Sequence, residues 1–76
     1  MFSKRLKDLR EDIDTSQLEL AKILKFDRST LGKYETGDRE PNFDIVIKIA
    51  KYFEVSTDYL LGITDIPTPY PQTKHK

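Results

Sequence analysis

The sequence predicts an all-α protein, in which a compact domain of five short helices is followed by a flexible, proline-rich tail. Apolar residues recur in several stretches at the three- and four-residue spacing of a buried helix face. No stretch shows the strict alternation of apolar and polar residues that is typical of a strand. Residues that favour helix starts precede these stretches, and glycines follow two of them. We therefore expect one domain over residues 1–62 and a flexible tail or linker over residues 63–76.

The first two helices are predicted from an apolar face and a capping pattern. Phe2, Leu6 and Leu9 share one face, so the first helix should run from residue 2 to about residues 12–14. Ser16 is followed three residues later by Glu19, which is a capping box in which each residue satisfies a free backbone amide of the other. This pattern predicts a second helix over residues 17–24.

The remaining helices are predicted from their cap residues. Asp27 and Gly37 bracket a third helix over residues 28–36, which a short turn separates from the second helix. Two short helices joined by so short a turn should cross steeply. Asn42 and Ser56 should start helices over residues 43–53 and 57–61. The expected inward face of the fourth helix comprises Phe43, Val46, Ile47, Ala50 and Phe53.

Composition excludes several kinds of site. The chain has 76 residues and no cysteine, so it can hold neither a disulfide nor a cysteine-based zinc site. No stretch approaches the roughly 20 apolar residues that cross a bilayer, and no apolar signal segment follows Met1. We therefore expect a cytoplasmic protein with no membrane partner.

An enzyme is not expected either. His75 is the single histidine, and it stands in a lysine-rich tail that gives a catalytic group no rigid support. The acidic residues are scattered, and no glycine-rich phosphate loop is visible. We predict no catalytic residue, no metal and no cofactor.

Net charge gives no indication of a nucleic-acid partner. Thirteen basic residues balance thirteen acidic residues, and residues 1–40 hold nine of each. A nucleic-acid interface must therefore be argued from the direction in which the charges point.

The third predicted helix has an unusual polar face. Glycine inside a helix costs about 1 kcal/mol relative to alanine, yet Gly32 stands in the middle of this one. A solvated face gives no reason for that cost, whereas a backbone that approaches another surface closely does. Arg and Lys side chains can read guanine edges, and Ser and Thr can contact bases or phosphates, so we interpret this face as one that enters a DNA groove. At 100° per residue, one arc free of carboxylates holds Arg28, Ser29, Gly32, Lys33 and Thr36, opposite Leu31 and Tyr34.

One long stretch of the chain reads SQLELAKILKFDRSTLGKYETGDREPNFDIVIKIAKYFEVSTDYLLG. This stretch resembles the helix-turn-helix domain of the phage Cro and cI repressors and the related XRE-type bacterial regulators. It contains the family's S/T-Q-x-x-L-A start, a short turn, a second helix ending in Y-E-x-G, a following proline, and V-S-x-x-Y-L-L-G. The resemblance extends over about residues 3–62. It implies a compact five-helix fold of the lambda-repressor type, with the helix-turn-helix at the second and third helices. The implied function is sequence-specific regulation of transcription through a palindrome-like double-stranded DNA operator. Repression is expected rather than activation.

The resemblance also assigns roles to individual residues. The base-reading positions in the major groove are Arg28, Ser29, Gly32 and Lys33. Contacts to the DNA backbone are implied for Ser16, Gln17, Lys25, Thr30, Thr36 and Arg39. Gln17 also has reach to a base, and a structural role is the alternative for Thr30. Arg10 and Glu35 match a pair that bridges the first and third helices, and the role implied for this pair is structural.

The sequence departs from the family pattern at three positions. Asp14 stands where the family often has a glycine, so this residue is expected to take a left-handed backbone. Lys25 replaces the usual glycine of the turn. Gly32 stands where many relatives carry a larger residue that can contact DNA, which would narrow the base-reading set.

A homodimer is the expected assembly, because repressors of this kind read two half-sites about one DNA turn apart. The alternative function is a protein-interaction module, such as an antitoxin or an adaptor subunit, whose DNA binding depends on a partner. The proline-rich tail resembles a linker, so a further C-terminal domain or a protein anti-repressor is another expected kind of partner. The predicted dimer surface comprises Tyr52, Tyr59, Ile63 and Ile66, of which the two tyrosines could instead complete the core.

Overall fold

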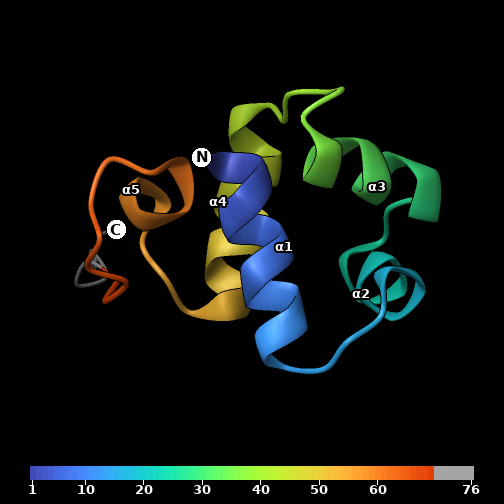
Figure 1. Ribbon diagram of the computed structural model, residues 1–76, viewed down its shortest axis with the longest axis horizontal. Coiled ribbons are helices and arrows are strands. Elements are labelled where there is room, and N and C mark those ends of the chain that lie inside the picture. The colour runs from blue at the N-terminus through green and yellow to red at the C-terminus, as the bar shows by residue number, and fades with distance from the viewer. Residues whose placement is uncertain (70–76) are drawn as a thin grey trace, which may run out of the picture.

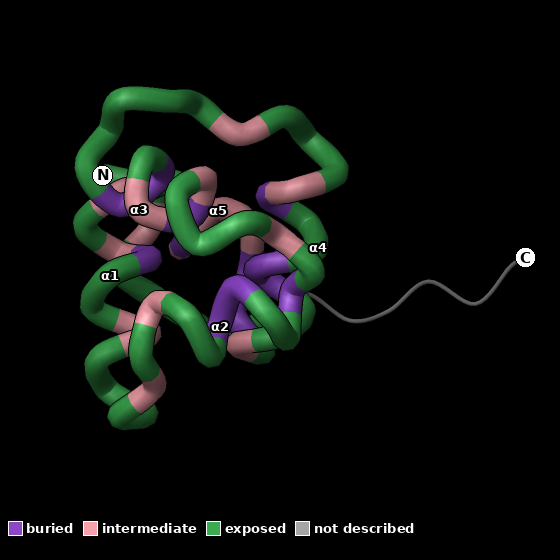
Figure 2. The backbone as a smooth tube through the Cα atoms, turned by 90° about the vertical axis from the view of Figure 1, so that its right-hand side faces the viewer, coloured by how far each residue is buried: buried purple, intermediate pink, exposed green. Residues whose placement is uncertain are grey.

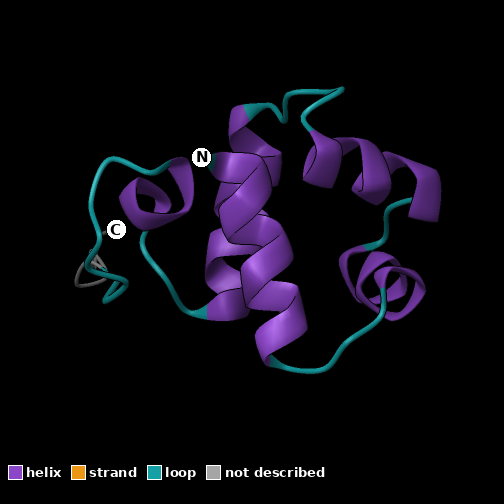
Figure 3. Cartoon of the chain, viewed as in Figure 1, coloured by secondary structure: helices purple, strands orange, loops and turns teal. Residues whose placement is uncertain are grey.

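Five helices make up the computed structural model, which describes residues 1–69 (Figure 1). They are α1 (Phe2–Asp12), α2 (Gln17–Leu24), α3 (Arg28–Thr36), α4 (Phe43–Phe53) and α5 (Thr57–Leu61). No strand occurs among the described residues (Figure 3). The predicted all-α class and five-helix architecture are therefore confirmed, and α2 to α5 have the predicted bounds.

Side-chain caps fix the start of three helices. The backbone amide of Glu19 donates to the Ser16 hydroxyl at 3.1 Å, and the Ser16 amide donates to the Glu19 carboxylate at 3.0 Å. Asn42 accepts a hydrogen bond from a backbone amide in the first turn of α4, and Ser56 does the same for α5. Asp27 occupies the predicted cap position of α3, although its side chain makes no cap hydrogen bond.

Left-handed backbone ends four of the helices. Gly37 and Gly62 have φ values of +86° and +84°, a region that costs glycine little. Lys25 and Glu54 take the same conformation at the ends of α2 and α4 without being glycines, with φ values of +63° and +57°. Asp14, in the loop before α2, has the left-handed φ that was expected for it. Chain direction at these points is therefore fixed by backbone geometry that three non-glycine residues adopt at some cost.

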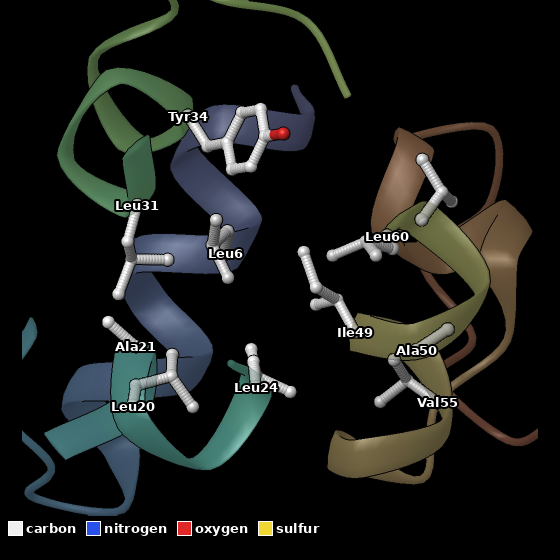
Figure 4. Close-up of a cluster of buried hydrophobic side chains, with 11 residues drawn as sticks. Leu6, Leu20, Ala21, Leu24, Leu31, Tyr34, Ile49, Ala50, Val55 and Leu60 are labelled. Carbon is white, nitrogen blue, oxygen red and sulfur yellow. The ribbon is translucent and has the colours of Figure 1, made fainter. Parts of the chain in front are cut away.

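Each helix contributes one fully buried side chain to a single core. These side chains point towards one another across the centre of the molecule (Figure 4). Burying one such side chain stabilises the fold by about 1.5–3 kcal/mol before conformational entropy is subtracted. The core therefore joins all five helices through Leu6, Leu20, Leu31, Ile49 and Leu60.

The predicted inward face of α4 is partly wrong. Phe43 is 87% exposed and Ile47 is 43% exposed, whereas Ile49 is fully buried. The apolar residues of α4 cover more than one face, so periodicity alone does not distinguish the buried stripe from its flank. Phe43 lies in the first turn, where α4 extends past the edge of the core.

Residues 63–67 are joined to the helices by specific hydrogen bonds. The Arg5 guanidinium donates to the carbonyl oxygens of Tyr59 at 2.9 Å and Thr64 at 3.0 Å, and to the Asp65 carboxylate at 2.8 Å. It also lies 4.0 Å from the centre of the Tyr59 ring. We call this set of contacts the Arg5 clasp. The domain boundary at residue 62 stays a prediction, and Pro71 and His75 lie outside the described residues.

Candidate nucleic-acid interface

α2 and α3 form a helix–turn–helix pair on one side of the molecule. In Figure 1, α2 is seen nearly end-on while α3 lies across the view, so the two helices cross steeply, as expected from the short turn. The turn is held by the Phe26 amide, which donates to the Ala21 carbonyl at 2.8 Å, and by the Phe26 ring, which packs edge-on against Tyr34. The left-handed Lys25 directs the chain into this turn. These contacts fix the position of α3 relative to α2.

The polar arc of α3 faces outwards. Leu31 and Tyr34 are buried against the core, and they fix the rotation of the helix. The opposite residues Arg28, Ser29, Lys33 and Thr36 are exposed, while Gly32 and Thr30 are half-buried. Buried and exposed residues therefore alternate along α3, as Figure 2 shows from the side that carries α2 and α3.

Arg10 and Glu35 join α1 to α3 by a buried ion pair. The Arg10 Nε and Nη2 atoms donate to the two Glu35 carboxylate oxygens at 2.6 Å and 3.0 Å. The Glu35 side chain is only 2% exposed and the Arg10 side chain 12% exposed. The hydrogen bond with Glu35 raises the pKa of Arg10 above its ordinary value. Arg10 also donates to the Thr15 carbonyl at 2.8 Å, so the pair anchors the loop that leads into α2.

Gln17 joins the same network from the first turn of α2. Its Nε2 atom donates to the Glu35 carboxylate at 3.0 Å. Every buried side-chain nitrogen or oxygen among residues 1–69 has a hydrogen-bond partner. A polar cluster with all its members satisfied rigidifies its surroundings, so this network holds α1, α2 and α3 in one arrangement.

The predicted backbone-contact residues have different environments. The Ser16 hydroxyl is occupied by its capping bond, and the Thr36 hydroxyl donates to the Lys33 carbonyl at 3.2 Å. Lys25 and Arg39 are exposed at the two ends of the α3 segment, one in the turn before it and one in the loop after it. Acidic side chains stand close by in sequence at 27, 38 and 40. The surface is therefore mixed in charge around a basic centre on α3.

The predicted dimer residues differ in their environments. Tyr59 is half-buried beneath Arg5, and Tyr52 packs edge-on against Phe53. Ile63 and Ile66 are largely exposed after α5.

A second exposed apolar surface was not predicted. Its residues line a hollow of about 600 Å³ between the start of α1, the α3–α4 loop, α4 and α5. The sequence carried no separate signal for it, because Phe43 and Ile47 were predicted as inward positions of the fourth helix. We call it the apolar hollow, and its exposed apolar residues are Met1, Phe43, Ile47 and Leu61.

Two further kinds of site have no support in the described part of the chain. No helix within residues 1–69 combines the length and apolar character that crossing a membrane requires. Within the same residues, no group of three or more His, Cys, Asp or Glu side chains could hold a metal ion.

Comparison with known proteins identifies the family of this helical arrangement. The family model described as Helix-turn-helix matches residues 6–60. The chain is 33% identical over 75 residues to the uncharacterised HTH-type transcriptional regulator YobD of Bacillus subtilis, covering 99% of this chain and 67% of that protein. It is 38% identical over 65 residues to the HTH-type transcriptional regulator ImmR of Bacillus subtilis, covering 86% of this chain and 51% of that protein. The chain thus spans two thirds or about half of the length of these relatives.

Solved structures show the same fold. The restriction-modification controller protein C.AhdI from Aeromonas hydrophila superposes with a TM-score of 0.71 at 32% identity, covering 78% of this chain and 89% of that chain. The P22 c2 repressor, solved in complex with a synthetic operator, superposes with a TM-score of 0.75 at 24% identity, covering 82% of this chain and 94% of that chain. These matches confirm the predicted lambda-repressor-like fold, with α2 and α3 as the helix-turn-helix. The chain belongs to the helix-turn-helix family of DNA-binding transcription regulators.

Proposed function

We propose that the protein represses transcription as a homodimer that places α3 of each copy in successive major grooves of a palindrome-like operator. One observation carries this proposal. The exposed face of α3 holds two cations and two hydroxyls around the half-buried Gly32 and has no carboxylate, while Leu31 and Tyr34 hold the helix against the core. The side of α3 that is free to meet DNA therefore has the donors that base edges and phosphates accept. The protein would act in the cytoplasm, where a bacterial operator lies.

Arg28, Ser29 and Lys33 are the proposed base-reading residues. Arg or Lys can donate to the O6 and N7 atoms of guanine, and Ser can donate to or accept from base edges. Gly32 lies between them on the same arc and lets the helix backbone approach the groove. Lys25, Thr30 and Arg39 are proposed phosphate contacts that set the register of the domain on the duplex. The hydroxyls of Ser16 and Thr36 already serve the backbone of their own helices, so we assign them the weaker part of this role.

A second copy of the chain is the proposed partner on DNA. The zero net charge gives a single domain little non-specific attraction to DNA, so two linked half-site contacts would raise affinity strongly. The surface is proposed to lie at Tyr52, Tyr59, Ile63 and Ile66, or at the apolar hollow. The hollow borders Arg39, the proposed phosphate contact, so a seam there would keep both α3 helices close to one face of the duplex. A further C-terminal domain or an anti-repressor protein is a second proposed partner, because the ImmR and YobD relatives are longer than this chain.

Selection of bound duplexes from a randomised DNA pool tests the proposal. A two-fold symmetric motif is expected, with half-sites about one helical turn apart. Lys33→Ala should lose about 1–3 kcal/mol on the selected operator and relax the preference at one base pair per half-site. Equal losses on operator and random DNA would remove Lys33 from base reading. If folded protein enriches no sequence, DNA binding that depends on a partner, as in the antitoxin or adaptor alternative, becomes the better explanation.

A further inference from the structure

We infer that residues 63–67 form a strap that docks on Arg5, and that docking of this strap fixes the position of α3 and so strengthens operator binding. The strap is a regulatory device built into the fold, because its release from Arg5 lowers the affinity for DNA. The effect on DNA rests on the proposed function, whereas docking of the strap and its effect on α3 do not.

The strap and α5 form one closed loop. The Ser56 amide at the start of α5 donates to the Pro67 carbonyl at 2.9 Å, so the far end of the strap returns to the residue where the helix begins. The Arg5 guanidinium bridges this loop from α1, because it donates to the Tyr59 carbonyl on α5 and to the Thr64 carbonyl on the strap. Arg5 therefore joins the two arms of the loop to each other and to α1.

Hydrogen bonds rather than core packing hold the strap in place. None of residues 63–67 is buried. The Arg5 side chain is only 13% exposed, and the strap supplies two of its acceptors, the Thr64 carbonyl and the Asp65 carboxylate. Tyr59 would still offer its carbonyl and its ring to Arg5 if the strap left. A segment with few buried contacts opens at low cost, so the strap has a docked and a released state within one folded chain.

The part of α1 that holds the strap also contacts α3. α1 lies between α5 and α3 in Figure 1. Phe2 precedes Arg5 by three residues, so their side chains occupy neighbouring positions on α1. The Phe2 ring packs edge-on against the Tyr34 ring of α3, with the ring centres 6.3 Å apart. Since Tyr34 helps to fix the rotation of α3, docking of the strap restrains the DNA-facing helix through the first turns of α1.

The variant Asp65→Lys releases the strap without changing a helix. The Asp65 side chain is 97% exposed, and a lysine there would repel Arg5 instead of accepting its hydrogen bond. Glu54→Lys is the matched control, because it makes the same change in net charge at an exposed residue that follows α4. Comparing these two variants removes the general effect of added positive charge on DNA binding.

Amide hydrogen exchange measures docking of the strap. The Ser56 amide is protected by the Pro67 carbonyl, so Asp65→Lys should speed its exchange about tenfold, which corresponds to the loss of one hydrogen bond between charged groups. Glu54→Lys should leave this rate unchanged. The Leu20 amide in α2 should exchange equally in both variants, which establishes that the fold is intact. Unchanged exchange at Ser56 in Asp65→Lys would overturn the inference.

Operator titration measures the coupling to DNA. Asp65→Lys should bind the selected operator about threefold or more weakly than Glu54→Lys does. Because coupling between two sites is reciprocal, saturating operator should slow exchange of the Ser56 amide in wild type by a similar factor. Equal operator affinity in the two variants would overturn the inference.

The Tyr34 ring distinguishes the route through α1 from other effects. Its proton resonances should shift in Asp65→Lys without DNA, whereas loss of the proposed dimer surface at Ile63 and Ile66 alone would leave them unchanged. Faster exchange at Ser56 with unchanged Tyr34 resonances would therefore overturn the inference. A pool that yields no operator would defeat the proposed function instead, and the Ser56 and Tyr34 measurements would still decide whether the strap controls α3.

Discussion

At the scale of single residues, the buried ion pair between Arg10 and Glu35 leads to a specific prediction about folding stability. Removing Arg10 leaves a carboxylate that is 2% exposed without its cation, although Gln17 still donates one hydrogen bond to it. Arg10→Met is therefore expected to destabilise the fold by about 3–5 kcal/mol, and the double change Arg10→Met with Glu35→Leu by less. Urea unfolding of the wild type, both single variants and the double variant measures the coupling. Additive losses would show that the two residues act independently.

Glu19 provides a pH dependence that can be isolated. Hydrogen bonds from the Ser16 backbone amide, and then from the Ser16 hydroxyl, lower the pKa of Glu19 below its ordinary value of 4.5. Because the pKa is lower in the folded state, its contribution to stability is present above the unfolded pKa and is lost as pH falls through the folded pKa. Glu19→Gln keeps a capping side chain but cannot titrate. The free energy of unfolding of this variant should therefore fall less steeply than that of wild type below about pH 4.5. Parallel pH profiles would contradict the assignment.

At the scale of the helix, α3 shows a conflict between stability and function at Gly32. An added Cβ would lie 3.8 Å from its nearest neighbour, which is an ordinary contact. Gly32→Ala should therefore stabilise the fold by about 1 kcal/mol through helix propensity alone. The same methyl group projects from the proposed DNA face, so operator affinity should fall while the melting temperature rises. Calorimetry and operator titration on one preparation test both effects, and unchanged affinity would remove the close-approach explanation for this glycine.

The ends of α2 and α4 form a matched pair for a second test. Lys25 and Glu54 both hold left-handed backbone that glycine adopts without a steric cost. Lys25→Gly and Glu54→Gly should each stabilise the fold by up to about 1 kcal/mol. Lys25 adjoins the proposed DNA face, so Lys25→Gly should also weaken binding to all sequences and reduce its salt dependence by about one unit. Glu54→Gly is the control, because it changes the same backbone feature at the end of α4. An unchanged salt slope for Lys25→Gly would exclude a phosphate contact.

The helices could be predicted because their signals are local. The capping box at Ser16 and Glu19, the caps at Asn42 and Ser56, and the glycines at 37 and 62 each act within a few residues of the chain. The 100° periodicity likewise predicted which side of α3 is buried. Asp27 also stands at its predicted cap position, and the absence of a side-chain cap bond there could not be read from residue type.

At the scale of the whole molecule, fewer features could be predicted from the sequence, because the relevant contacts join residues that are far apart along the chain. The exposure of Phe43 depends on where the core ends, and the Arg5 clasp joins residues 54 to 60 positions apart. The pairing of Arg10 with Glu35 followed from family resemblance, and nothing in the spacing of Gln17 indicated that it would join them. The identities of the base-reading residues remain predictions, since they depend on a DNA partner.

Dimerisation belongs to this scale as well. Phe43 is 87% exposed, so Phe43→Ser should change folding stability little. If the apolar hollow is the dimer seam, the variant should be monomeric at concentrations where wild type associates, and it should bind half-sites independently. Sedimentation equilibrium and operator titration measure these effects. Ile66→Ser is the comparison, because Ile66 is 66% exposed on the other proposed surface. Association lost only in Ile66→Ser would place the seam after α5.

The Arg5 clasp has a mechanical consequence. One guanidinium ties the first turns of α1 to the chain that emerges from α5, so the two ends of the folded region cannot fray separately. α1 also packs against both α3 and α5, so it connects the proposed DNA-facing helix to the exit of the chain. The Ser56 amide also donates to the Pro67 carbonyl at 2.9 Å, so a load applied to the chain beyond Pro67 would reach the start of α5 first and the Arg5 clasp next. Anything that pulls on that exit would therefore act on α1, and through it on the proposed DNA-facing helix, by way of α5 and Arg5.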